Sequence, residues 1–112
     1  MITGVHAILY APDAERVRTF FRDVLEWPHV DAGHGWLIFA TPPAEIAAHP
    51  APTPSHELYL MCDDVAATVA KLESKGVRFT APVADRGWGL VTRFELPGGG
   101  EIGLYEPRHA RP

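Results

Sequence analysis

The chain of 112 residues lacks most of the features that define specialised classes of protein. Its one cysteine, Cys62, excludes an intrachain disulfide framework and a cysteine-rich zinc site. No apolar run approaches the roughly 20 residues that span a bilayer, and no basic segment precedes an apolar run near the first residue, so we expect a cytoplasmic protein without a membrane segment. The 10 Lys and Arg residues are fewer than the 14 Asp and Glu and are scattered, which argues against nucleic acid as a partner.

What the chain does contain is ordinary apolar content, 46% of its residues, interrupted by 11 prolines and 10 glycines. A chain of this length buries roughly two thirds of its unfolded surface. The small net charge of −4 excludes disorder as the main state. The sequence therefore predicts a single domain, residues 1–112, built from short elements that are separated by turns.

The first half of the chain shows a strand pattern, then a helix pattern, then further strands. Residues 4–10 are an apolar run of strand formers, and Asp13 follows where a helix N-cap is expected. The apolar stripe of the helix comprises Val17, Phe20, Phe21, Val24 and Leu25. Short strands are predicted at residues 36–40 and 45–49, before a proline-rich joint at residues 50–54.

The second half repeats this order. Residues 56–62 read as a strand, Asp64 is placed to cap a helix, and Gly76 is placed to end it. Three more strands are predicted, at residues 77–79, 90–96 and 101–106. The order of elements predicts a duplicated module, the first copy at about residues 1–53 and the second at about residues 54–112.

Several motifs accompany this repeat: His6 seven residues before Asp13, Asp63-Asp64-Val65 at the second helix, Gly76-Val77 after it, and a Pro-Gly-Gly-Gly turn before Glu-Ile-Gly-Leu-Tyr in residues 96–107. Together they resemble the vicinal oxygen chelate superfamily, the glyoxalase, bleomycin resistance and extradiol dioxygenase group. The resemblance implies an α+β fold in which two βαβββ modules form an open, cup-shaped, eight-stranded sheet. It also implies a homodimer and a cup that holds a divalent metal or a small molecule, and it leaves open whether the modules pair within a chain or across the dimer.

The resemblance also implies where metal ligands would stand. The four positions are His6, Ala47, Glu57 and Gly103, and the resemblance implies that catalytic members carry glutamate where this chain has Ala47 and Gly103. At Gly103 the absent side chain is expected to open volume in the cup. Only His6 and Glu57 carry donor atoms, whereas a catalytic ion usually has three protein ligands. His56 replaces Glu57 on the cup face only if the strand slips by one residue. The neighbours that could complete a shifted site are Glu45, His49 and Glu101.

Strand alternation separates a core face from a cup face. The strand residues expected on the cup face include His6, Tyr10, Glu57, Tyr59, Met61, Glu101 and Tyr105. Trp36 and Trp88 are further candidates: Trp36 either packs in a core or lines the cup, and Trp88, in a glycine-flanked loop, either covers the mouth or packs elsewhere. Aromatic groups with a few polar ones suit a small, planar ligand.

These observations favour a small-molecule binding protein that sequesters an aromatic or hydrophobic compound, as the resistance proteins of the family do, with a degenerate metal site and no metal cofactor. The alternative is a metal-dependent lyase or oxidoreductase of the glyoxalase or dioxygenase type with a rearranged site at His6 and Glu57. A third interpretation is a regulatory subunit whose cup is vestigial. No residue can be assigned a catalytic role from the sequence alone.

Overall fold

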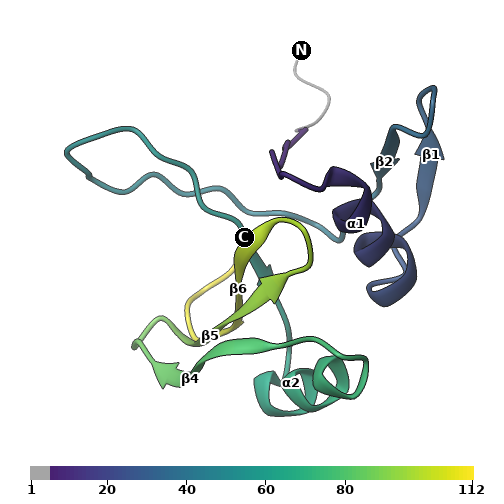
Figure 1. Cartoon of the computed structure of the whole chain (residues 1–112). Helices are drawn as coiled ribbons and strands as arrows, with labels where there is room; N and C mark the ends of the chain where they lie inside the picture. The colour runs from purple at the N-terminus through teal and green to yellow at the C-terminus, as the bar shows by residue number, and fades with distance from the viewer. Residues whose placement is uncertain (1–5) are drawn as a thin grey trace.

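The computed structural model describes residues 6–112 (Figure 1). In chain order the elements are α1 (Ala14–Thr19), a π-helical turn η1 (Phe20–Val24), β1 (His29–Asp31), β2 (Leu37–Phe39), β3 (Tyr59–Met61), α2 (Val65–Ser74), β4 (Phe79–Asp85), β5 (Gly89–Leu96) and β6 (Gly100–Pro107). This mixture of helices and sheet strands confirms the predicted α+β class. Within the described range, no helix is long and apolar enough to cross a membrane.

The second half of the chain forms a complete βαβββ module. Its four strands lie side by side in the order β3-β6-β5-β4, and α2 connects β3 to β4. Strand β3 runs parallel to β6, with Tyr59 opposite Gly103, while β5 pairs with both β4 and β6 in antiparallel fashion. The register therefore sets the first strand of the module directly against its last strand.

Local sequence chemistry determines where both helices begin. The Asp13 carboxylate accepts a hydrogen bond from the Arg16 backbone N–H at 3.2 Å, and the Asp64 carboxylate accepts one from the Ala67 N–H at 3.1 Å. Each contact satisfies one of the free amides of a first helical turn. At the other end of α2, Gly76 has a φ of +87°, a conformation in which a side chain is strained. Both predicted N-caps and the predicted helix end are confirmed.

The first half is less complete than the sequence predicts. Its strands β1 and β2 form a separate hairpin, in which Val30 lies opposite Ile38, and β1 was not predicted. Residues 6–10 and 45–49 form no strand ladder, so the strands predicted there are wrong; the start of the first one, residues 4–5, lies outside the described residues. A ladder needs both partners, and the second segment lies between prolines, which lack a backbone donor. The described strands therefore number six in two sheets, and not eight in one.

One core lies against the four-stranded sheet and draws side chains from both halves. Its buried members are Val17, Phe20, Phe21, Val65, Leu72, Val77, Phe94, Leu96, Ile102 and Leu104. The Phe20 ring packs 6.0 Å from the Phe94 ring, centroid to centroid, and the Asp13 N–H donates to the Gly98 carbonyl at 3.1 Å. Helix α1 is thereby anchored to the second module. Because alternate residues of β6 enter this core, Gly103 and Tyr105 face the opposite side.

Candidate ligand-binding site

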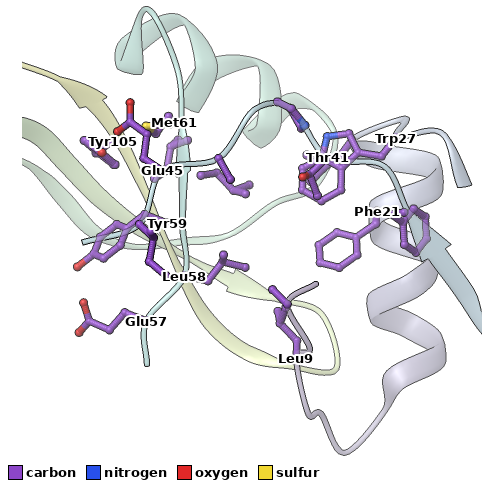
Figure 2. Close-up of a pocket in the computed structure, with 18 of the residues that line it drawn as sticks. Leu9, Phe21, Trp27, Thr41, Glu45, Glu57, Leu58, Tyr59, Met61 and Tyr105 are labelled. Carbon is purple, nitrogen blue, oxygen red and sulfur yellow. The ribbon is translucent and has the colours of Figure 1, made fainter. Parts of the chain in front are cut away.

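An open cleft of about 2980 Å³ lies between β3, the extended segments at residues 6–11 and 41–55, and the C-terminal residues 109–112. Figure 2 shows part of its lining, with aromatic and aliphatic side chains beside a few carboxylates. Pockets for small molecules are usually about 300–1,000 Å³. A small ligand would therefore fill only part of this cleft.

Most of the side chains predicted for the cup line this cleft. They are His6, Tyr10, Trp36, Glu57, Tyr59, Met61, Trp88 and Tyr105. Glu101 does not line the cleft, and its carboxylate lies 3.5 Å from the Arg93 Nε. Eight of the nine predicted residues therefore line this cleft.

The Tyr59 ring occupies the space beside Gly103, one of the two positions where the resemblance implies a glutamate that this chain lacks. The two residues are partners across the β3–β6 ladder. A Cβ atom built on Gly103 would overlap the Cδ1 and Cε1 atoms of the Tyr59 ring. The sequence suggested that Gly103 opens volume in the cup; that expectation is wrong, because the tyrosine fills the volume.

A second glycine makes room for a second tyrosine. A Cβ atom on Gly89 would lie 2.8 Å from Tyr105 Cδ2 and 3.0 Å from the carbonyl oxygen of Glu106, so only glycine lets this ring pack against the strand. Tyr105 then meets Tyr59 at 5.7 Å and 88°, and Trp88 at 5.2 Å and 74°, as ring-centroid distances and interplanar angles.

The rings of Tyr59, Trp88 and Tyr105 form what we call the aromatic corner. Tyr59 and Trp88 are themselves 6.2 Å apart at 89°, so the three planes are nearly perpendicular to one another. Edge-to-face contacts of this kind stabilise an aromatic cluster by about 0.5–1.5 kcal/mol per pair beyond burial. Trp88 remains 45% exposed, which leaves ring surface available to a ligand.

Hydrogen bonds hold Trp88 in place. It lies in the turn between β4 and β5, where the Arg86 N–H donates to the Gly89 carbonyl at 2.9 Å. The Arg108 N–H donates to the Trp88 carbonyl, also at 2.9 Å. The sequence left open whether this loop covers the mouth or packs elsewhere; these two bonds hold its backbone, and its indole lines the cleft.

Trp36 is placed differently from Trp88. Its side chain is 67% exposed, and the Arg18 guanidinium carbon lies 5.6 Å from the ring centroid, within the range of a cation–π contact. Of the two interpretations of the sequence, core packing is therefore wrong for this tryptophan within the chain, and cleft lining is what the structure shows.

The C-terminal residues contribute side chains that the sequence did not suggest. The His109 Nε2 atom lies 3.1 Å from the Tyr105 hydroxyl oxygen, with the two ring centroids 5.9 Å apart. The Arg111 Nε donates to the Glu45 carboxylate at 2.7 Å. These residues read only as a polar tail in the sequence, because no local pattern indicates that the chain turns back over β6.

Cys62 is half-buried at the end of β3, and its thiol donates to the Tyr105 carbonyl at 3.6 Å. Burial is the largest effect on this group and raises the pKa of the thiol above its ordinary value. A thiol that stays protonated is a poor nucleophile and a poor metal ligand. This environment indicates a structural role for Cys62.

The donor set does not fit a metal centre of the family type. Ala47 and Gly103 have no donor atoms, and the Tyr59 ring covers the second position. Among residues 6–112, no three His, Cys, Asp or Glu side chains are grouped so that they could hold an ion. His6 and Glu57 both line the cleft, but two ligands are fewer than a catalytic ion usually has.

Comparison with known proteins places this geometry in a family. The model of the Glyoxalase/Bleomycin resistance protein/Dioxygenase superfamily matches residues 4–107, and the chain belongs to this superfamily. No curated protein sequence matches the chain at the significance required.

Solved structures share the fold. TnmS3, an antibiotic binding protein from Streptomyces sp. CB03234, is 27% identical, with 95% of this chain and 97% of that chain covered and a TM-score of 0.68. A glyoxalase/bleomycin resistance protein from the same organism is 28% identical, with coverage of 87% and 94% and a TM-score of 0.58. A lactoylglutathione lyase from Agrobacterium tumefaciens is 16% identical, with 95% of each chain covered and a TM-score of 0.65, which shows the fold alone.

Proposed function

We propose that this protein binds a small aromatic or hydrophobic molecule in its cleft and sequesters it without chemical change. The observation that carries the proposal is the Tyr59 ring over Gly103, because the place of a metal ligand has become part of an aromatic surface. An aromatic surface binds by stacking and exclusion of water, and needs no ion.

The aromatic corner is the proposed contact surface for this molecule. Tyr59 and Tyr105 are fixed by strands β3 and β6, and Trp88 is fixed by the turn before β5, so the ligand meets rings that are already in position. Preorganised side chains reduce the ordering cost of binding. The similarity to TnmS3, which is described as an antibiotic binding protein, supports a binding role of this kind.

We further propose that the protein works as a homodimer. Several large apolar side chains along the extended segments are highly exposed, namely Ile8 at 62%, Tyr10 at 90% and Ile46 at 92%. Exposed apolar surface of this extent usually marks an interface, and symmetric pairing is the commonest way to cover it. A second copy would also reduce the cleft toward the size of a ligand pocket. Mass measurement by light scattering at micromolar concentration tests this, and a strict monomer would contradict it.

Three expectations from the sequence stay predictions. They are the single domain at residues 1–112 with modules at about 1–53 and 54–112, the cytoplasmic location, and the absence of nucleic acid and membrane partners. Limited proteolysis near residues 50–54 would test the single domain. A joint between independent units is cleaved before either unit unfolds. Early cleavage there that releases two stable fragments would contradict a single domain.

Titration calorimetry with a panel of planar aromatic compounds tests the binding function, followed by crystallography of any complex. We expect saturable binding at one site per protomer, with the ligand in contact with Trp88. Absence of binding across the panel would overturn the proposal.

Metal analysis of the purified protein tests the alternative enzyme. Stoichiometric iron, zinc, manganese or nickel that is lost in His6→Ala would favour a metal-dependent lyase or oxidoreductase with a rearranged site at His6 and Glu57.

A further inference from the structure

The hydrogen bonds of His109 determine what the Tyr105 hydroxyl can offer to a ligand. The His109 Nδ1 atom lies 2.9 Å from the Ala110 carbonyl oxygen. A carbonyl oxygen can only accept, so Nδ1 carries the ring hydrogen in this contact. In the neutral imidazole, Nε2 is then an acceptor.

The same tautomer directs the hydrogen of the tyrosine. With Nε2 as an acceptor 3.1 Å from the Tyr105 oxygen, the hydroxyl donates its hydrogen to His109. The oxygen of Tyr105 keeps its lone pairs, and these are all that it can present to a molecule in the cleft. At the aromatic corner, Tyr105 therefore acts as an acceptor only.

The carboxylates near the aromatic corner are also hydrogen-bond acceptors. Glu57 precedes Tyr59 by two residues, and its carboxylate lies on the same side of the strand in Figure 2. Glu45 lies close enough to Tyr105 for its charge to raise the pKa of the phenol, although burial contributes more to that shift. Ionised carboxylates also only accept hydrogen bonds. The Arg111 Nε donates to Glu45, and the positive charge of this guanidinium partly offsets the effect of Glu45 on the pKa of the phenol.

We infer that the position beside the Tyr105 hydroxyl selects a hydrogen-bond donor on the aromatic ligand, an aromatic amine in particular, and that His109 is a specificity-determining residue. This inference rests on the proposed binding function and adds the chemical class of the ligand. A donor on the ligand pairs with the free lone pairs of Tyr105, whereas an ether or ketone oxygen in the same place would meet another oxygen and leave both unpaired.

The test compares two probes with the same ring, 2-naphthylamine and 2-methoxynaphthalene, with naphthalene as a reference. All titrations run at pH 8 in the same buffer. We expect the amine to bind about tenfold more tightly than the ether, which corresponds to about 1.4 kcal/mol and to one well-formed hydrogen bond.

Two variants assign this preference to the His109–Tyr105 pair. His109→Phe keeps a ring beside Tyr105 but frees the hydroxyl hydrogen, so the ether should gain affinity and the preference should fall below about threefold. Tyr105→Phe removes the oxygen and should abolish the preference. His56→Phe, at an exposed histidine that does not line the cleft, is the matched control and should keep the tenfold ratio.

The outcomes separate the two proposals. Equal binding of the amine and the ether by the unmodified protein, or a tenfold ratio that persists in His109→Phe, would overturn the inference about ligand class and leave the binding function standing. Failure of all three naphthalene compounds to bind would count against the binding function itself, and the inference would fall with it.

Discussion

The Tyr59 ring lies against the backbone of Gly103, its partner across the parallel β3–β6 ladder, in the space that a side chain at position 103 would need. In the sequence the two residues are 44 positions apart, and nothing local connects them. Their contact explains how a strand without a side chain at position 103 can still be well packed. A larger side chain at position 103 would have to displace the ring.

Gly103→Glu should therefore destabilise the protein without creating a metal site. Overpacking of this kind typically costs about 1–3 kcal/mol, because the ring must leave its position. Ala47→Glu is the matched control: it restores the other glutamate position at an exposed residue, so the free energy of unfolding should change by less than about 0.5 kcal/mol. Urea denaturation measures both. Equal effects of the two substitutions would show that the Tyr59 ring does not restrict position 103.

Trp88→Ala should weaken aromatic ligands by about tenfold, since it removes one face of the aromatic corner. The free energy of unfolding should also fall, by about 1–3 kcal/mol, because the indole makes two edge-to-face contacts, with Tyr59 and with Tyr105. Trp36→Ala removes an indole that also lines the cleft but lies beside Arg18, away from the corner contacts. Calorimetric titration of the two variants with one ligand distinguishes the sites. A larger loss in Trp36→Ala would place the ligand elsewhere in the cleft.

Tyr105 should make the stability of the protein fall at alkaline pH. Burial, assisted by the charge of Glu45, raises the pKa of its phenol in the folded state. Below the ordinary tyrosine value of about 10 both states are neutral, and this contribution to stability is fully present. Above that value the unfolded chain loses its proton first, so the free energy of unfolding declines as pH rises toward the folded-state pKa.

Urea denaturation between pH 8 and 11 measures this decline. We expect a smaller decline in Tyr105→Phe than in the unmodified protein. Tyr10→Phe, at a tyrosine that is 90% exposed, should leave the decline unchanged. If the free energy of unfolding declines equally in both variants and in the unmodified protein, burial of Tyr105 does not contribute to the decline.

Cys62 should react slowly with thiol reagents in the folded protein. Burial raises the pKa of its thiol, so little thiolate is present near neutral pH. We expect the rate of labelling at pH 8 to be at least tenfold below that of a free cysteine. Addition of denaturant should restore the rate, and rapid labelling without denaturant would indicate that β3 opens readily.

Helix boundaries could be read from the sequence because their causes are local. Asp13 and Asp64 each cap a helix through a backbone amide three residues ahead, and Gly76 adopts a conformation that its own lack of a side chain permits. The apolar stripe that follows Asp13 is likewise a property of a few consecutive turns. The family motifs, together with these helix boundaries, predicted the α+β fold class.

Strand pairing and the shape of the site were decided only by the tertiary structure. Residues 6–10 have the composition of a strand but form no ladder, since a strand depends on a partner that the chain must supply from elsewhere. The Tyr59–Gly103 packing joins residues on two different strands. The His109–Tyr105 hydrogen bond joins β6 to a residue beyond its end. Alternation along a strand shows which side a residue faces, but what occupies that side depends on segments that only folding brings together.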